Sequence, residues 1–196
     1  MEPVSHLLYL HGFRSSPQST KARRVARWLA ENRPEVVWHC PQLPPSPAEA
    51  MRGVLAKVAG WPRERMAVVG SSLGGFYATV VAEAFGCRAV LLNPAVDPAR
   101  DLSKYIGEIT AWHSDERFHF RAGFVDELRR ISPPTLTDLG RYLAIIAKGD
   151  EVLDWHEMSA RYAGCNVKLL DGSDHALSDF DAHLPDLLGF LGLHET

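Results

Sequence analysis

The sequence predicts a doubly wound α/β domain: a mostly parallel six-stranded sheet with helices on both faces, which makes three layers. Six short apolar runs recur along the chain, and most of them are separated by longer stretches with helical spacing of the apolar residues. Strands joined by helical crossovers pair in parallel and are covered on both faces. We therefore expect all six strands to be buried on both faces. They span residues 6–10, 35–40, 65–70, 88–93, 141–147 and 166–170.

The first two crossovers have clear helix signals. Apolar residues recur at i, i+3, i+4 and i+7 over residues 22–29, which predicts an amphipathic helix that begins near Ser19 or Thr20. Ser46 followed by Pro47 is typical of a cap and first turn, and predicts a second helix that ends near residue 58.

Two more helices follow from the later sequence. One is expected to begin directly after Ser72, and the last is expected to close the chain before Gly192. The last helix is predicted by a single apolar stripe, whose members are Leu177, Phe180, Leu184, Leu187, Leu188 and Leu191.

Residues 97–139 do not fit the alternation of strands and helices. They mix aromatic residues with charges and end on the breaker pair Pro133 and Pro134. We interpret about 97–139 as a lid-like insertion within one domain that spans residues 1–196; the alternative is an ordinary crossover helix with an irregular loop. Candidate pocket residues are Trp112, Phe118 and Phe120, together with His11 from the loop after the first strand.

Composition excludes several classes of protein. With 21 Lys and Arg against 24 Asp and Glu, the net charge is −3, which disfavours a nucleic-acid partner or a polybasic membrane anchor. No apolar run approaches the roughly 20 residues of a membrane helix, and the N-terminus lacks the pattern of a signal peptide. Three widely spaced cysteines, at 40, 87 and 165, do not form a disulfide framework or a CxxC motif. We expect a cytoplasmic protein.

The most informative motif is GxSxG, formed by Gly70, Ser72 and Gly74 between an expected strand and an expected helix. A sharp turn at this point strains the serine backbone and requires neighbours without side chains, so that strand and helix can approach. The alternative is a glycine-rich turn that serves only close packing or binds an anion. We predict that Ser72 is a nucleophile and that Gly70 and Gly74 permit its turn.

A serine nucleophile needs a general base and a carboxylate that orients the base, and in this fold they follow in the order Ser, acid, His. Asp150 comes after the strand ending at residue 147, and His175 comes after the strand ending at residue 170. The carboxyl ends of parallel strands meet at one edge, so Ser72, Asp150 and His175 are expected to lie together. Asp154 and Asp174 are alternative acids.

The chemistry also requires two backbone N–H donors for the tetrahedral oxyanion. We expect one from Leu73, directly after the nucleophile, and the other from Phe13, after the turn at His11 and Gly12. No metal or organic cofactor is expected, because this chemistry uses none and the sequence has no zinc-binding spacing such as HExxH.

Six segments together resemble the YqiA-like family of small esterases within the α/β-hydrolase superfamily. They are LYLHGFRSSP, PQLPPSP, VVGSSLGGFYA, NPAV at 93–96, KGDEVLDW at 148–155 and DGSDHALSDF at 171–180. The resemblance spans nearly the whole chain and is weakest over 109–137. It implies a three-layer α/β-hydrolase fold whose minimal sheet lacks the first two strands of larger members, and it places Ser72, Asp150 and His175 at the triad positions of the family.

Motif and resemblance predict a serine hydrolase that cleaves carboxylic esters or acyl thioesters through a Ser-His-Asp triad and an acyl-enzyme. The expected partner is a small-molecule acyl substrate, without nucleic acid or membrane insertion. The same triad also serves C–C bond hydrolases and acyltransferases. A different class of alternative is a non-catalytic protein that binds a ligand or partner on the same scaffold.

Overall fold

The computed structural model describes residues 3–110 and 117–193. The strands are β1 (His6–Leu10), β2 (Val37–His39), β3 (Met66–Ser71), β4 (Arg88–Leu92), β5 (Gly107–Thr110), β6 (Arg117–Phe120), β7 (Tyr142–Ala147) and β8 (Asn166–Leu170). The helices are α1 (Thr20–Asn32), α2 (Pro47–Val58), α3 (Leu73–Phe85), α4 (Pro98–Leu102), α5 (Ala122–Ile131), α6 (Trp155–Arg161) and α7 (Leu184–Leu191). Short 3₁₀ helices span Arg63–Arg65, Ser103–Tyr105, Leu139–Arg141 and Phe180–Ala182.

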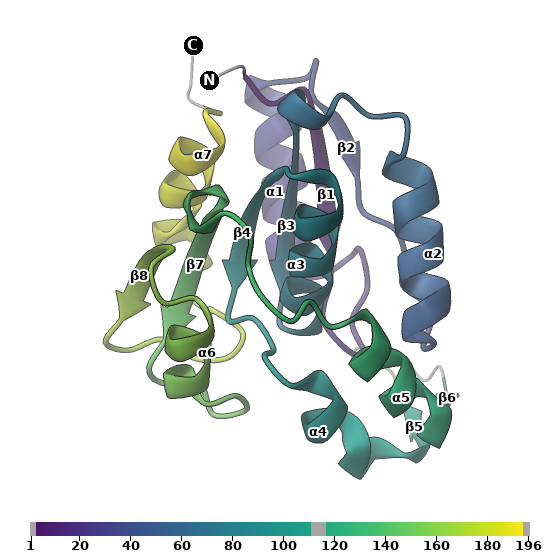
Figure 1. The fold of residues 1–196 in the computed structure, drawn as a ribbon. Helices are drawn as coiled ribbons and strands as arrows, with labels where there is room; N and C mark the ends of the chain where they lie inside the picture. The colour runs from purple at the N-terminus through teal and green to yellow at the C-terminus, as the bar shows by residue number, and fades with distance from the viewer. Residues whose placement is uncertain (1–2, 111–116, 194–196) are drawn as a thin grey trace.

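The main sheet has six strands in the order β2-β1-β3-β4-β7-β8 (Figure 1). Every neighbouring pair in it is parallel, so the predicted fold class is confirmed. Each of the six expected strands is present, with ends displaced by at most two residues at β2 and by one residue elsewhere.

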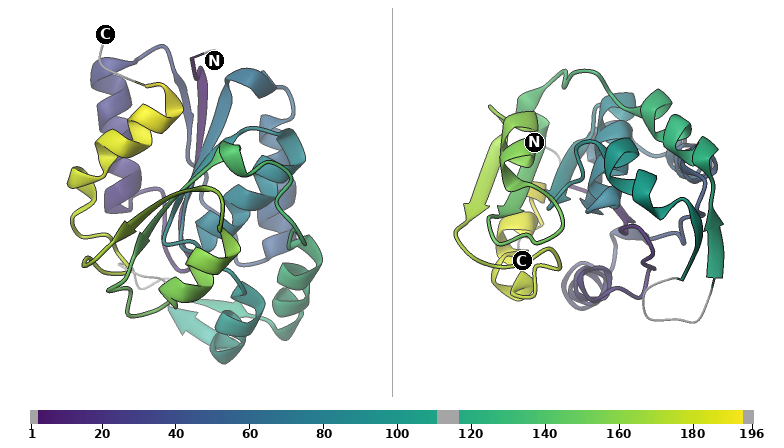
Figure 2. Two further views of the ribbon diagram at one scale, coloured as in Figure 1. Left: turned by 60° about the vertical axis from the view of Figure 1, so that its left-hand side comes forward. Right: turned by 90° about the horizontal axis from the view of Figure 1, so that it is seen from below.

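Helices cover the sheet on both faces (Figure 2). The side chains of alternate strand residues pack into two separate cores. One core lies under α1 and α7, where Val25 and Leu187 pack with residues such as Val69 of β3. The other lies under α2 and α3, where Val54 and Val81 join residues of the opposite strand face. Because successive strand residues point to opposite faces, continuous apolar runs are what a sheet covered on both sides requires.

The expectation that all six strands are buried on both faces is wrong for the two edge strands. Val37 in β2 is 46% exposed, and both Val167 and Leu169 in β8 are 40% exposed. An edge strand has a neighbour on one side only, and here one face of each is left without a covering helix. The inner strands β3 and β7 are buried throughout.

The last helix is shorter than predicted. All six residues of the apolar stripe are buried, as expected. A separate 3₁₀ turn at Phe180–Ala182 precedes α7, however, and Leu177, with a φ of 50°, lies in neither element. Pro185 stands in the first turn of α7. A proline has no N–H to donate and clashes with the preceding turn, so a single helix through this point is disfavoured.

Within residues 97–139, the described part forms α4, the antiparallel pair β5–β6 and α5. Figure 1 shows these elements beyond the carboxyl ends of the sheet strands. Glu127 on α5 accepts hydrogen bonds from the Ser46 hydroxyl at 2.8 Å and the Ala48 N–H at 3.0 Å, both at the start of α2. The middle of α5 is therefore fastened to the start of α2. Among the described residues, no helix is long and apolar enough to cross a membrane.

Candidate active site

Ser72 occupies the turn between β3 and α3. Its φ of 57° and ψ of −119° lie in a region that residues with a side chain rarely adopt. Its N–H donates to Leu92 O at 3.0 Å, and its carbonyl accepts from Ala95 N at 3.0 Å. The last residue of β4 and the segment after it therefore hold the strained residue at both its N–H and its carbonyl.

The glycines of the motif are required by the space around them. A Cβ on Gly70 would lie 2.0 Å from the Gly74 carbonyl oxygen, and a Cβ on Gly74 would lie 1.9 Å from the Leu10 carbonyl oxygen. Both distances are far inside van der Waals contact. The motif thus lets α3 start directly against β3 and the end of β1, as its sequence context indicates.

The structure brings together the three residues expected to form a triad. His175 Nε2 lies 3.1 Å from Ser72 Oγ, and His175 Nδ1 lies 2.8 Å from Asp150 Oδ2. Because a carboxylate only accepts, Nδ1–H of the neutral ring donates to Asp150, which leaves Nε2 free to accept the Ser72 O–H. This is the arrangement that a serine needs in order to lose its proton.

The Asp150 side chain is fully buried and fixed at both oxygens. Its other oxygen, Oδ1, accepts from the N–H groups of Val152 and Leu153, each at 2.8 Å. The His175 side chain keeps 21% of its surface exposed, so it is reachable from solvent. A buried carboxylate with both oxygens bonded can hold an imidazole in one tautomer and orientation.

The two alternative acids are engaged elsewhere. Asp154 caps α6, where it accepts from the N–H and the ring of His156, both at 2.9 Å. Asp174 accepts from the N–H and the hydroxyl of Ser178. These hydrogen bonds hold the pKa of each carboxyl below its usual range. Neither contacts the ring of His175.

The expected oxyanion donors lie on either side of Ser72. Leu73 is the first residue of α3, where an N–H has no intrahelical acceptor. Gly12 packs against Ser72, since a Cβ built on it would be 3.4 Å from Ser72 Cβ. Phe13 follows Gly12 directly. No residue within 3–110 or 117–193 accepts a hydrogen bond from the N–H of Phe13 or Leu73.

The aromatic residues of the insertion surround the Phe13 ring. Ring centroids lie 5.3 Å away for Phe120, 5.5 Å for Tyr105 and 6.1 Å for Phe118. Phe120 is buried and Phe118 is partly buried, whereas Trp112 lies outside the described residues. The next residue, Arg14, donates to Thr110 O of β5. The loop after β1 is therefore braced by the β5–β6 pair.

His11, a predicted pocket residue, lies in the loop after β1, and both of its ring nitrogens are occupied by backbone groups. It is 3% exposed, its Nδ1–H donates to Gly12 O at 2.9 Å, and its Nε2 accepts from the Leu43 N–H at 3.0 Å. Burial lowers the pKa of this ring. A neutral His11 thus ties the QLPP segment to the loop after β1.

Sequence reasoning did not single out three further residues around His175. Asn93 donates to the carbonyls of Asp174 and His175, Lys21 donates to the Ala176 carbonyl, and Glu151 accepts from the His175 N–H at 3.0 Å. Only Asn93 carried a signal, since it opens the NPAV segment directly after a strand. The other two contacts join parts of the chain that no local pattern connects.

The described residues contain neither a reactive cysteine nor a cluster of metal-binding side chains. Burial raises the pKa of Cys40 and of Cys87 to about 12, and that of Cys165 is also raised, so all three are protonated and weakly nucleophilic at neutral pH. In the segments 3–110 and 117–193, no three His, Cys, Asp or Glu side chains gather in a way that could hold a metal.

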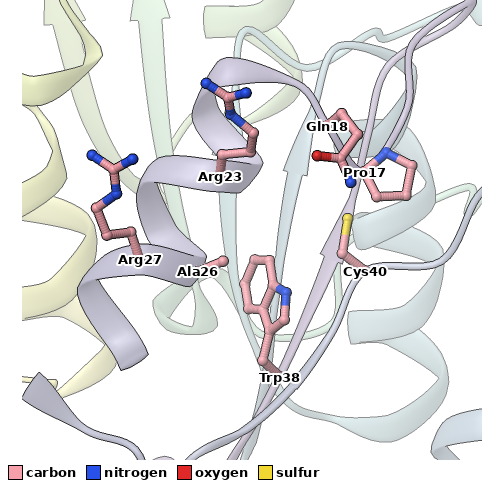
Figure 3. Close-up of a pocket in the computed structure, with 7 residues that line it drawn as sticks. All are labelled: Pro17, Gln18, Arg23, Ala26, Arg27, Trp38 and Cys40. Atoms are coloured by element: carbon pink, nitrogen blue, oxygen red, sulfur yellow. The ribbon is translucent and has the colours of Figure 1, made fainter. Parts of the chain in front are cut away.

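A cavity of about 480 Å³ lies beside α1 and is lined by Arg23, Ala26 and Arg27 of this helix, whereas Lys21 of α1 contacts the His175 loop. Figure 3 shows its lining from α1 and the loop before it, together with residues from the end of β2. The lining residues are Pro17, Gln18, Arg23, Ala26, Arg27, Trp38 and Cys40. None of the triad residues belongs to it, so this cavity is separate from the Ser72 site.

Comparison with known proteins gives a family and a fold. A sequence-family model described as "Uncharacterised protein family (UPF0227)" matches residues 6–192. The fold is similar to that of the alpha/beta hydrolase domain-containing protein 10 from mouse, with a TM-score of 0.70 at 16% identity over 97% of this chain and 92% of that one.

Two further solved structures are similar. A structure reported for LipS and LipT, two metagenome-derived lipolytic enzymes, has a TM-score of 0.68 at 20% identity, covering 98% of this chain and 95% of that one. Est1E from Butyrivibrio proteoclasticus, solved with ferulic acid bound, has a TM-score of 0.69 at 15% identity, covering 98% and 90%. At these identities the similarity establishes the α/β-hydrolase fold.

Proposed function

The chain belongs to the UPF0227 family and has the α/β-hydrolase fold, and from this premise we propose that it is a serine hydrolase that cleaves carboxylic esters or acyl thioesters. The family membership confirms the resemblance to YqiA-like proteins seen in its six segments. The observation that carries the proposal is the continuous contact from Asp150 through His175 to the strained Ser72.

In the proposed reaction, Ser72 Oγ attacks the acyl carbonyl while its proton passes to His175 Nε2. Asp150 stabilises the imidazolium that forms, since its Oδ2 accepts from Nδ1–H. The carbonyl oxygen becomes an oxyanion, and the N–H groups of Leu73 and Phe13 donate to it. Collapse of this intermediate breaks the bond to the alcohol or thiol, which takes the proton from His175.

The second half of the reaction releases the acid. Water attacks the acyl-enzyme, gives its proton to His175 Nε2 and forms a second oxyanion in the same place. Collapse breaks the bond to Ser72 Oγ, which recovers the proton from His175. The free enzyme is restored without a metal or an organic cofactor.

An apolar surface near Ser72 supports a hydrophobic acyl group. It is the aromatic cluster around Phe13, the residue after Gly12, which packs against Ser72. A second cavity, of about 310 Å³, has a mixed lining, in which Phe76, Val96 and Leu128 stand beside Asp97, Arg129 and Ser132. Phe76 N donates to Ser72 O at 3.3 Å, and Val96 follows Ala95, which also binds that carbonyl. We interpret residues 97–139 as an insertion in a single hydrolase domain that walls this site.

Hydrolysis of a series of p-nitrophenyl esters and acyl-CoA thioesters of increasing chain length tests the proposal. We expect turnover by the wild type and a loss of at least about a thousandfold in Ser72→Ala. Ser71→Ala is the matched control, because it removes the neighbouring hydroxyl and should keep its activity. Equal loss in both variants, or turnover retained in Ser72→Ala, would contradict the assignment of the nucleophile.

The same series of substrates also tests the alternative that the protein is a non-catalytic binding protein. A protein that only binds a ligand on this scaffold would show no turnover of any ester or thioester from a folded wild type. The three unpaired cysteines support a cytoplasmic location for the proposed enzyme.

A further inference from the structure

Asn93 lies at the end of β4, at the centre of the sheet, and is 1% exposed. Its φ of 43° is a left-handed conformation, which asparagine tolerates better than most residues with a side chain. Its N–H still donates to Ile145 O of β7 at 3.0 Å. The residue is thus held in the sheet while its side chain turns out of the strand.

The amide of Asn93 binds two different segments. Nδ2 donates to the carbonyls of Asp174 at 2.9 Å and His175 at 3.2 Å. Oδ1 accepts from the Ala147 N–H at 2.8 Å, at the end of β7 and three residues before Asp150. Both amide protons and one lone pair are used, so this buried side chain is satisfied.

The strand order explains why such a link is needed. Ser72 follows β3, whereas His175 follows β8, and β4 and β7 lie between them. Neighbouring strands are about 4.8 Å apart, so the loop after β8 must fold back across the ends of two strands to reach Ser72. Asn93 fastens it at the point where it crosses β4.

Residues 92–95 form hydrogen bonds with the chain at Ser72, at the end of β7 and in the His175 loop. Leu92 O and Ala95 N hold the backbone of Ser72, while the Asn93 amide reaches the end of β7 and the carbonyls at 174 and 175. The N–H of His175 is bound on its other side by Glu151, next to Asp150. The peptide that carries the base is therefore anchored at both its N–H and its C=O.

We propose that Asn93 is a positioning residue that sets the His175 loop against Ser72 and the Asp150 strand. This inference rests on the proposed hydrolase function. No other side chain of similar size supplies the same pattern: Asp keeps the acceptor for Ala147 and loses both donors, and Ala loses all three bonds.

The test uses Asn93→Ala and Asn93→Asp, with Asn166→Ala as the matched control. Asn166 also donates from Nδ2 to two carbonyls, of Gly140 at 3.3 Å and Tyr142 at 3.0 Å, but at the far end of the same strands. Misplacement of a reacting group by about 1 Å can cost about a hundredfold in rate. We expect kcat for a p-nitrophenyl ester to fall by about ten- to a hundredfold in both Asn93 variants, with KM within about twofold. Asn166→Ala should keep kcat.

One further readout separates local positioning of the His175 loop from a general loss of stability. Amide hydrogen exchange over residues 171–178 should accelerate in the Asn93 variants and not in Asn166→Ala. If Asn93→Ala fails to fold, Asn93→Asp, which is closest in shape, carries the test.

The inference is overturned if kcat in the Asn93 variants stays within about twofold of the wild type, or falls no more than in Asn166→Ala. It is also overturned if exchange over 171–178 is unchanged, and this measurement holds even for a protein that hydrolyses no ester. A wild type without turnover would refute the proposed function alone, so the two failures are distinguishable.

Discussion

At the scale of single residues, the site depends on which carboxylate contacts the base. Three aspartates are candidates for the acid: Asp174 directly precedes His175, and Asp150 and Asp154 follow strand β7. Sequence order favours Asp150 without excluding the other two. The structure separates them by burial and partner. Asp150 is fully buried against the ring, whereas the other two bind groups of their own loops.

Replacing each acid by its amide tests this choice. Asp150→Asn should lower kcat by about three to four orders of magnitude, because an amide can no longer hold the His175 tautomer that accepts the serine proton. Asp154→Asn should change kcat little, since Asn is as good a helix cap as Asp. Steady-state kinetics on one ester give the ranking, and the reverse ranking would show that the acid has been misassigned.

His11 predicts a pH dependence of stability. Burial keeps the folded-state pKa of the His11 ring below 6.5. As the pH falls below 6.5, His11 is therefore protonated in the unfolded chain before it is protonated in the folded chain. The free energy of unfolding should therefore fall as the pH decreases, by up to about 1.4 kcal/mol per pH unit for this proton. Above pH 6.5 this contribution is constant.

Denaturant unfolding of the wild type and His11→Gln between pH 5 and 7.5 measures the effect. Gln can still accept from the Leu43 N–H but does not titrate, so its curve should fall less steeply than that of the wild type. Parallel curves would mean that the ring of His11 takes up its proton in the folded state.

At the scale of elements, the contact of β1, β3 and α3 forms the turn at Ser72. Gly74→Ala should lower the free energy of unfolding by about 3 kcal/mol or prevent folding, because its Cβ would meet a strand carbonyl that cannot move aside. Gly53→Ala in α2 is the control. A Cβ there meets nothing within 4 Å, so this variant should gain up to about 1 kcal/mol. Thermal unfolding of the two variants decides, and a tolerated Gly74→Ala would contradict the close approach.

The elements differ in how far the sequence predicts them. The inner strands are continuous apolar runs, and the start of α2 is marked by Ser46 and Pro47. Local sequence patterns are therefore enough to predict these elements. The pair β5–β6 was not predicted. Both strands are only four residues long, and β6, which alternates basic with aromatic side chains, is held by contact with Phe13, far away in the chain. The exposed faces of β2 and β8 depend on strand order, which no single run contains.

The site shows the same division. Ser72, its glycines and the place of His175 can be predicted because a turn motif and the ends of strands are local signals. The partners of the His175 loop cannot be predicted in this way. Asn93, Lys21 and Glu151 reach it from three different elements, and their roles exist only once the sheet has assembled.

At the scale of the whole molecule, the parallel sheet brings Ser72, Asp150 and His175, which are far apart in the sequence, together at one edge. The proposed nucleophile, acid and base follow three different strands, and α4, the β5–β6 pair and α5 lie beyond the same carboxyl ends (Figure 2). We therefore infer that the fold strains and activates a single serine, Ser72.

Intact-mass analysis after incubation with a fluorophosphonate tests that claim most directly, since the reagent labels only activated serines. We predict one adduct per wild-type chain, mapped to the peptide with Ser72, none in Ser72→Ala, and full labelling in Ser71→Ala. A folded wild type that forms no adduct, or an adduct on any other residue, would contradict the claim that Ser72 is an activated nucleophile.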